Sequence, residues 1–281
     1  FQQAIARSKP RCVITALSSV SEAIIPLAEQ AGVFQIGVLT SSERILEGRK
    51  NIQRINDRSG DMMGPLAQYI LPRGKKAAII YANNELGLSC NAAFKTIFTN
   101  GGGTVLSETG FALDNRDVRE LVRKTLEAKP DAIVVAGFGP AYIAIFRTLK
   151  EASYAGLILA DANFSNPEAL ADLGTAAEGV IFVTLDLCLD TPTGAETQLF
   201  KKAYKAKFGN EPWLGAAYIY DALTILDNQV KGNKTPSQQS FAELGSWKGV
   251  TGTIDFVGNG ECKLKYVLLK RQDSASVHVT D

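Results

Sequence analysis

Residues 13–23 read VITALSSVSEA, a short apolar run that passes through serines into a helical pattern. Ser19 and Glu22 have the S-x-x-E spacing of a capping box, which marks the first turn of a helix. The pattern returns at residues 33–43, where a second apolar run ends in Thr40-Ser41-Ser42-Glu43. Unbonded N–H groups and the helix dipole attract anions to helix starts, particularly at the carboxyl ends of strands in open α/β sheets. The two stretches therefore predict an anion site, although such serines also occur merely as helix caps.

The composition is that of a globular chain without a strong charge. The 281 residues are 46% hydrophobic, and 30 Lys and Arg stand against 29 Asp and Glu. This balance argues against nucleic-acid binding, which requires a basic excess. No run of 18 apolar residues occurs, so no membrane insertion of this segment is predicted. The four cysteines are widely spaced without a C-x-x-C pair, which excludes an ordinary zinc site but leaves disulfides and buried thiols both open.

Strand and helix patterns alternate along most of the chain, which predicts parallel, doubly wound α/β sheets with short connections. Pro26 should bend the first of these helices or delay its start. The expected strands cover residues 12–16, 33–38, 76–81, 104–108, 132–136, 157–160 and 180–185, with a β-rich tail from 252. The expected helices cover residues 20–31, 61–71, 88–98, 114–128, 140–152, 195–208 and 215–230, and S-x-x-E predicts a further short one from Ser165.

Motifs for catalysis or cofactor binding are incomplete. Residues 137–142, GFGPAY, begin like a dinucleotide fingerprint, but Tyr142 replaces the third glycine and Pro140 lacks an N–H. Residues 87–91, GLSCN, lack the final glycine of a nucleophile elbow, and the single histidine, His278, lies in a polar tail. The sequence therefore predicts no enzyme, no cofactor and no metal, and favours helix starts that hold a small polar ligand.

Six stretches carry a family resemblance through their order: residues 13–19, 28–33, 75–81, 129–135, 176–180 and 220–222. Together they resemble the type I periplasmic solute-binding proteins of ABC transporters, in the branched-chain amino-acid (leucine/isoleucine/valine) binding group. The resemblance implies two doubly wound α/β lobes joined by a three-segment hinge, with a ligand closed between them. Lobe I is expected at residues 1–56 plus 186–257, and lobe II at 57–185 plus 258–281. The hinge segments are expected near residues 53–57, 183–186 and 255–260.

The family's binding residues transfer to this chain one by one. Its ligand-carboxylate serine falls on Ser19, and the next strand end falls on Thr40, with its backbone, and Ser41, the residues already reached from helix capping. In the second lobe, Leu86 stands where the family often has a tyrosine before glycine, and Phe138 keeps a ligand-facing aromatic.

The family's ammonium-binding acid falls at or beside Ala162, with Asp161 one position away. If Asp161 turns toward the ligand, an aliphatic amino acid is expected. If it faces elsewhere, a carboxylic acid without an amino group is favoured, because a buried cation without a partner is costly.

The resemblance implies a receptor that captures a small carboxylate-bearing ligand, a branched-chain or related amino acid, for the permease subunits of an ABC importer. It is expected as a monomer in the periplasm, or as an extracellular lipoprotein in a Gram-positive organism. The alternatives are binding of an aromatic or aliphatic carboxylic acid, and a ligand-sensing module of the same fold. Family members begin with two further βα units, so about 60 residues are expected to precede the helix that ends near Ala6.

Overall fold

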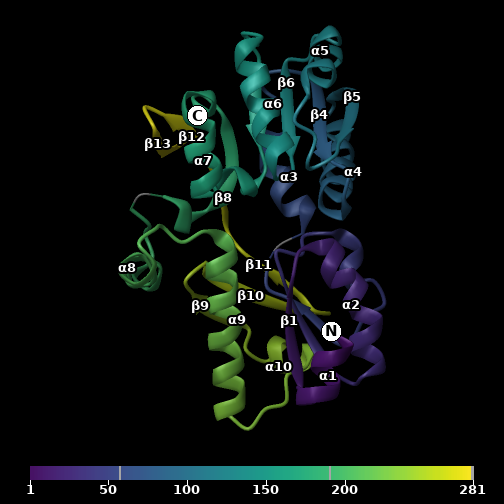
Figure 1. The fold of residues 1–281 in the computed structure, drawn as a ribbon, viewed down its shortest axis with the longest axis vertical. Coiled ribbons are helices and arrows are strands. Elements are labelled where there is room, and N and C mark those ends of the chain that lie inside the picture. The colour runs from purple at the N-terminus through teal and green to yellow at the C-terminus, as the bar shows by residue number, and fades with distance from the viewer. Residues whose placement is uncertain (57, 190, 280–281) are drawn as a thin grey trace. The chain divides into compact units, whose positions relative to one another are not determined.

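The computed structural model describes residues 1–56, 58–189 and 191–279. The chain forms two compact units, one of Phe1–Arg58 with Thr191–Lys265 and one of Ser59–Asp190 with Tyr266–Asp281 (Figure 1). It passes between them after residues 58, 190 and 265. Residues 186–189, expected in the first lobe, therefore belong to the second unit, and residues 258–265, expected in the second lobe, belong to the first unit. The hairpin partner of the preceding strand lies within 258–265, which keeps that segment in the first unit. Residue 57 of the first expected hinge segment, residue 190 and residues 280–281 lie outside the described residues.

A three-stranded parallel sheet forms the centre of the first unit. Its strands are β1 (Cys12–Ala16), β2 (Phe34–Val38) and β3 (Ile52–Arg54), in that order. Every residue of β2 is buried, as expected for a strand covered on both faces. Helices α2 (Ser18–Gln30) and α9 (Leu214–Lys231) both pack on it, from two sides (Figure 1). Because the strands are parallel, their carboxyl ends meet at one edge.

The remaining elements of the first unit complete its layers. They are α1 (Gln2–Ser8), the 3-10 helix η1 (Glu43–Leu46), α8 (Ala195–Phe208), α10 (Gln238–Ala242) and the antiparallel strands β9 (Ser246–Gly249), β10 (Gly252–Gly258) and β11 (Glu261–Lys263). The carboxylate of Asp221 on α9 accepts hydrogen bonds from the backbone N–H groups of Val250 (2.8 Å) and Thr251 (3.0 Å) and from the Thr251 hydroxyl (2.6 Å). Asp221 thus fastens the turn between β9 and β10 to the helix.

A seven-stranded sheet forms the centre of the second unit, in the order β13-β12-β8-β7-β6-β4-β5. These strands are β4 (Lys76–Ala82), β5 (Thr104–Phe111), β6 (Ala132–Ala136), β7 (Leu157–Ala160), β8 (Ile181–Leu185), β12 (Tyr266–Gln272) and β13 (Ala275–His278). The strands β4 to β8 are parallel, and β12 and β13 are added antiparallel. The chain moves outward from β4 to β5 and then returns to β6 on the other side of β4. The direction of winding therefore changes between β4 and β6, the position at which open α/β sheets bind ligands.

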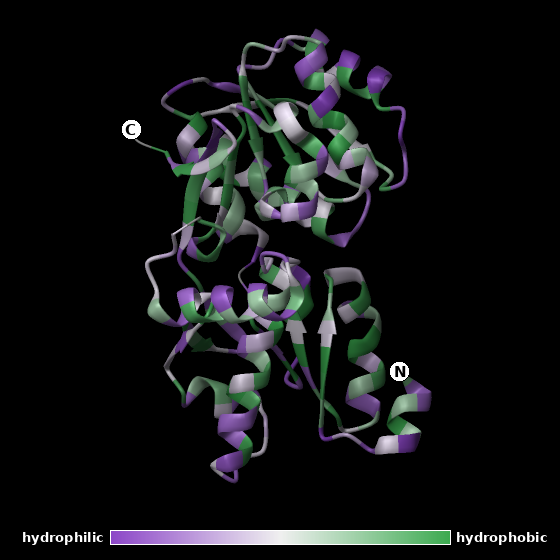
Figure 2. Cartoon of the chain, turned by 60° about the vertical axis from the view of Figure 1, so that its left-hand side comes forward, coloured by the Kyte–Doolittle hydropathy of each residue, from purple (hydrophilic) through white to green (hydrophobic). Residues whose placement is uncertain are grey.

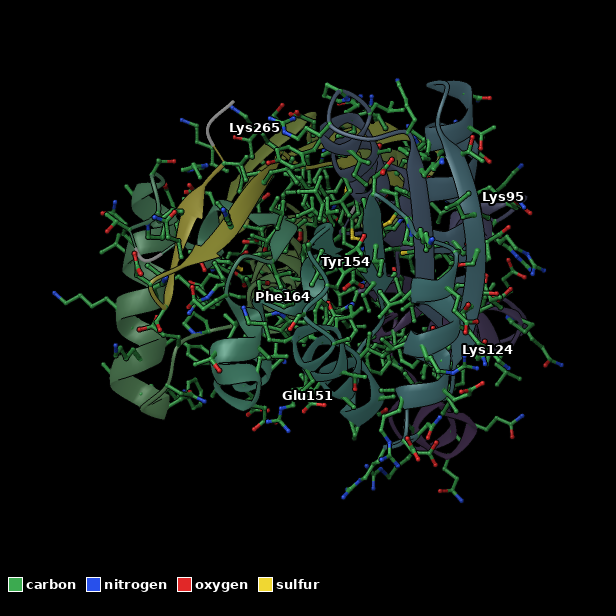
Figure 3. All side chains as sticks on the ribbon, turned by 90° about the horizontal axis from the view of Figure 1, so that it is seen from above. Lys95, Lys124, Glu151, Tyr154, Phe164 and Lys265 are labelled. Atoms are coloured by element: carbon green, nitrogen blue, oxygen red, sulfur yellow. The ribbon has the colours of Figure 1, made fainter. Side chains whose placement is uncertain are left out.

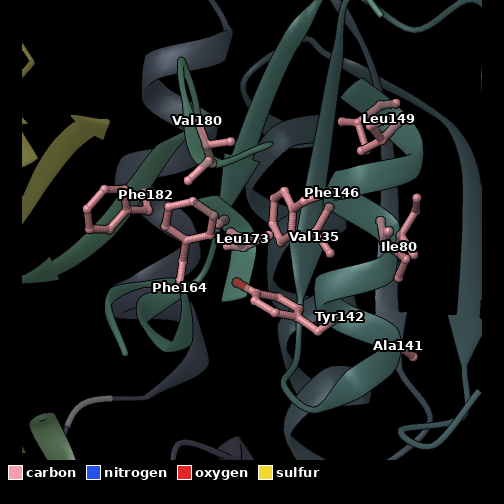
Figure 4. Close-up of a cluster of buried hydrophobic side chains, with 14 of the residues drawn as sticks. Ile80, Val135, Ala141, Tyr142, Phe146, Leu149, Phe164, Leu173, Val180 and Phe182 are labelled. Carbon is pink, nitrogen blue, oxygen red and sulfur yellow. The ribbon is translucent and has the colours of Figure 1, made fainter. Parts of the chain in front are cut away.

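Helices cover the second sheet, and aromatic side chains fill its core. The helices are α3 (Ser59–Ile70), α4 (Glu85–Asn100), α5 (Arg119–Glu127), α6 (Pro140–Glu151) and α7 (Pro167–Leu173), with the 3-10 turns η2 (Ala162–Ser165), η3 (Gly174–Ala177) and η4 (Asp186–Cys188). The rings of Tyr142, Phe146, Phe164 and Phe182 follow one another at centroid distances of 4.9, 5.1 and 5.0 Å (Figure 4). The strands are mostly hydrophobic and the outer helix faces hydrophilic (Figure 2), and Lys95 and Lys124 project from the surface while Phe164 lies inside (Figure 3).

Several expected element starts are wrong. Helix α2 begins at Ser18 with Leu17 at its N-cap position, so Ser19 lies inside the first turn and forms no capping box with Glu22. The Ser21 N–H already donates to the Leu17 carbonyl (2.9 Å), which is why the helix starts earlier, and it continues through Pro26. Residues 40–43 lead only into the short η1, which Ser42 caps through the Arg44 N–H.

Two further helices, α5 and α7, begin later than their capping patterns predicted. Asn115 accepts a hydrogen bond from the Asp117 N–H, a local turn that competes with the helix, and α5 consequently begins at Arg119 instead of after residue 114. The short helix α7 is capped by Asn166 and not by Ser165. The four cysteines form no disulfide with one another.

Candidate functional site

The first unit has two strained strand ends. Leu17 and Leu39 each follow the last residue of a strand, β1 and β2, with φ angles of 72° and 54°. A bulky L residue rarely adopts this region, and each instance costs on the order of 1–3 kcal/mol. Such strain persists where the surrounding structure enforces it, often at ligand-binding sites. These two turns lead the chain from the sheet edge into the predicted binding residues.

The two strand ends are joined by Ser18, which sequence reasoning passed over in favour of its neighbour. The buried Ser18 hydroxyl oxygen accepts a hydrogen bond from the Ser42 N–H at 3.3 Å. Ser19 is exposed in the first turn of the 13-residue helix α2. The structure thus brings the two predicted serine-rich stretches together at the carboxyl edge of one sheet, as the sequence pattern predicted.

Thr40 and Ser41 are held by Asn56, which lies just after β3. Thr40 is fully buried, and its N–H and hydroxyl both donate to Asn56 Oδ1, at 2.9 and 3.2 Å. Asn56 Nδ2 in turn donates to Ser41 Oγ at 3.0 Å, and Ser41 is 6% exposed. The Thr40 N–H, which the sequence analysis offered to a ligand, is therefore already donated in this structure. No motif in the sequence indicated Asn56.

Behind these residues lies a fully buried arginine, Arg54, the last residue of β3. Its Nη1 donates to the carbonyl oxygens of Thr40 (2.9 Å) and Ser42 (2.7 Å). Its Nε and Nη2 form a bidentate pair with the Glu261 carboxylate, at 3.3 and 2.6 Å. No local pattern indicated this arginine, because its partners lie in two other segments, residues 40–42 and Glu261.

In the second unit, Leu86 lies in the first turn of α4, after β4, and Phe138 lies two residues after β6; these strands flank the change of winding direction. Both side chains are half-buried. Asn84 caps α4 through the Gly87 N–H at 2.9 Å, and a Cβ on Gly87 would lie 2.0 Å from the Ala82 carbonyl oxygen. Only glycine therefore allows the first turn of α4 to approach β4 so closely, and this approach places Leu86 beside the strand end.

Asp161 lies at the end of β7 and is fully buried. Its carboxylate accepts hydrogen bonds from the Gly137 N–H (3.1 Å), the Tyr142 hydroxyl (2.9 Å) and Asn163 Nδ2 (2.7 Å). Burial raises the pKa of Asp161 to about 7, against the lowering effect of these three donors. Burial, followed by the nearby Asp161 charge, also raises the Tyr142 pKa. Asp161 thus faces the interior and ties the turn after β6 to α6, while the adjacent Ala162 is 6% exposed.

The described residues lack two other features, a metal site and a membrane span. Among residues 1–56, 58–189 and 191–279, no three His, Cys, Asp or Glu side chains gather in a way that could hold a metal ion. In the same part of the chain no helix is both long and apolar enough to span a bilayer.

The amino-acid sequence matches a known protein family over most of its length. A model described as periplasmic binding protein matches residues 1–260 of the 281. The chain belongs to this family. The resemblance inferred from the sequence is confirmed, and periplasmic binding proteins of this group are solute-binding proteins, not enzymes, as the sequence analysis predicted.

This periplasmic binding protein is similar to individual proteins in sequence and in structure. The chain is 26% identical over 183 residues to the Leu/Ile/Val-binding protein homolog 3 of Brucella melitensis, a match that covers 64% of this chain and 49% of the relative. The structure superposes on a leucine binding protein, LivK, of Thermotoga maritima with a TM-score of 0.89 and 22% identity, over 99% of this chain and 81% of that one.

Two further solved structures were described with bound ligands. A solute binding protein of an ABC transporter from R. palustris, in complex with benzoate, has a TM-score of 0.87 and 19% identity, over 99% of this chain and 79% of that one. LivJ of Streptococcus pneumoniae, in complex with isoleucine, has a TM-score of 0.86 and 20% identity, over 98% and 80%. At these identities the superpositions establish the periplasmic binding protein fold, and the two-lobed α/β architecture expected from the sequence is confirmed.

Proposed function

We propose that this protein is the solute receptor of an ABC importer, which captures a small carboxylate-bearing molecule in the periplasm or outside the cell and presents it to the permease. The observation that carries the proposal is the pair of strained strand ends at Leu17 and Leu39, which set the serine-rich stretches side by side through the Ser18–Ser42 hydrogen bond. Ser19 and Ser41 are the proposed ligand contacts in the first unit.

The chemistry of this edge suits an anion. Ser19 lies in the first turn of α2, where backbone N–H groups and the helix dipole favour negative charge. A charge-assisted hydrogen bond from a serine hydroxyl contributes about 1.5–3 kcal/mol, so Ser19→Ala or Ser41→Ala should weaken binding of a carboxylate roughly 10- to 100-fold. Calorimetry that finds unchanged affinity in both variants would remove these residues from the site.

Asp161 bears on the class of ligand. An α-ammonium needs an acidic partner when it is buried, but the Asp161 carboxylate has no exposed surface and already accepts three hydrogen bonds from the protein. The neighbouring position, Ala162, offers a methyl group, and Leu86 and Phe138 are apolar. We therefore propose an aromatic or branched aliphatic acid without an amino group as the ligand, with a branched-chain amino acid as the second candidate.

A matched pair of ligands tests this choice. Leucine and 4-methylpentanoate share a side chain and a carboxylate and differ only in the ammonium group, and benzoate represents the aromatic acids. The melting temperature of the protein should rise with 4-methylpentanoate or benzoate and not with leucine. Stabilisation by leucine alone would refute the proposed ligand class. The absence of a shift with all three acids would count against the receptor itself.

A further inference from the structure

A buried guanidinium is bonded to the loop at residues 40–42. Arg54 has no exposed surface, and its Nη1 reaches two carbonyl oxygens of that loop, those of Thr40 and Ser42. We propose that Arg54 is the positioning residue that holds this loop in its ligand-binding conformation, without touching the ligand. The inference rests on the proposed function, because it assigns the loop to ligand binding.

The physical reason is the direction of the loop's dipoles. A carbonyl oxygen that faced an incoming carboxylate would repel it, whereas an N–H or hydroxyl would attract it. Arg54 binds two carbonyl oxygens of the loop, at positions 40 and 42, and so turns them toward the protein interior. The residue between them, Ser41, is buried but keeps 6% of its surface exposed, whereas Thr40 and Ser42 keep 0% and 1%. Arg54 therefore removes unfavourable acceptors from the binding edge and leaves the serine side chain in place.

The guanidinium itself is located by a second segment of chain. Glu261, at the start of β11 and 207 residues from Arg54 in the sequence, accepts two hydrogen bonds from the guanidinium. Two further hydrogen bonds to one carbonyl reinforce this link: the backbone N–H of Arg54 donates to the Gly260 carbonyl (2.9 Å), and the side-chain Nε2 of Gln53 donates to the same oxygen (3.0 Å). A Cβ on Gly260 would lie 2.6 Å from the Ile52 carbonyl oxygen, so glycine is required for this approach.

Arginine suits this position better than lysine does. The guanidinium presents five N–H donors in a planar fork, and here it serves one carboxylate and two carbonyls at once. A lysine would supply the charge but could not reach both sides of the network in a fixed plane. The conservative change Arg54→Lys therefore separates the fork geometry from the charge.

The opposing hypothesis is that Arg54 merely contributes to the stability of the unit. Asp221→Asn provides the matched control, because Asp221 is also a buried carboxylate that fastens a turn of the same unit but makes no bond to residues 40–42. Its loss should destabilise the unit without changing the loop. Comparison with this control shows whether an effect on binding exceeds what lost stability produces.

The experiment measures two quantities in Arg54→Lys, Glu261→Gln and Asp221→Asn. The first is amide exchange at Thr40, whose N–H is bonded to Asn56, set against global unfolding in urea. In Arg54→Lys and Glu261→Gln, we expect amide exchange at Thr40 to accelerate at least about 10-fold beyond what the change in global stability explains. In Asp221→Asn we expect no such excess. The second is affinity for 4-methylpentanoate, benzoate and leucine by calorimetry, which should fall about 10-fold in the same two variants.

The outcomes separate the two proposals. If exchange at Thr40 and affinity follow global stability in all three variants, Arg54 is a structural residue only and the inference is overturned. If the unaltered protein binds none of the three acids, the receptor proposal fails, and the exchange measurement still decides whether Arg54 orders the loop. Unchanged exchange in Glu261→Gln, with the fold intact, would likewise refute the role assigned to the pair.

Discussion

The buried carboxylate of Asp161 should make the second unit less stable as the pH rises. Burial raises its pKa from 3.8 to about 7 in the folded state. Between these two values the folded chain binds more protons than the unfolded chain, so the free energy of unfolding decreases with increasing pH. The contribution is most favourable below pH 4, falls through the window from about 4 to 7, and is lowest above pH 7.

The magnitude follows from the two pKa values. With one titrating group, the free energy of unfolding is expected to fall by about 2.5 kcal/mol between pH 5 and pH 8. Asp161→Asn should abolish this component. The amide oxygen can accept from Gly137 and Asn163, and its NH₂ can donate to the Tyr142 hydroxyl, which then reverses its role. We therefore expect little loss of stability at pH 8.

The assay compares urea unfolding of the unaltered chain and Asp161→Asn at pH 5 and pH 8. Both tryptophans, Trp213 and Trp247, belong to the first unit, so fluorescence follows that unit and circular dichroism is needed for the second. Asp172→Asn, on the exposed side of α7, is the matched control for adding an amide. If the unaltered chain and Asp161→Asn lose the same free energy between the two pH values, the burial argument is refuted.

Two further predictions concern backbone geometry. Gly87→Ala should lower the free energy of unfolding of the second unit by about 1–3 kcal/mol or more, because its Cβ would lie 2.0 Å from the Ala82 carbonyl oxygen. Its control, Gly64→Ala in α3, meets no atom within 4 Å and should be neutral or stabilising. Equal melting temperatures of the two variants by circular dichroism would contradict this. Leu17→Gly should be more stable than Leu17→Ala by about 1–2 kcal/mol, measured by tryptophan fluorescence in urea, because glycine tolerates a φ of 72°; greater stability of the alanine variant would show that the backbone is not strained there.

Local sequence patterns predicted much of the secondary structure. The strands β1, β6 and β7 and the helix α8 span the residues that the sequence predicted, because short apolar runs bounded by turns favour buried strands and longer runs favour helices. Helix starts were less predictable. Ser19, Ser165 and Asp114 fit capping patterns, but a neighbouring residue, Leu17 or Asn166, or a competing turn at Asn115 determined the actual start.

The same division holds for the candidate site. The sequence by itself determined which residues follow the strands. In the first unit these are Ser19, Thr40 and Ser41, in the second Leu86 and Phe138, and within each sheet parallel strands must bring their carboxyl ends to one edge. Only the tertiary structure decided what each does. Thr40 turned inward because it donates to Asn56 Oδ1, and Asp161 turned inward because it accepts from the Tyr142 hydroxyl; both partners come from other segments of the chain. Arg54 gained its role from Glu261, 207 residues away, and no local pattern encodes a hydrogen bond whose two halves meet only after the chain has folded.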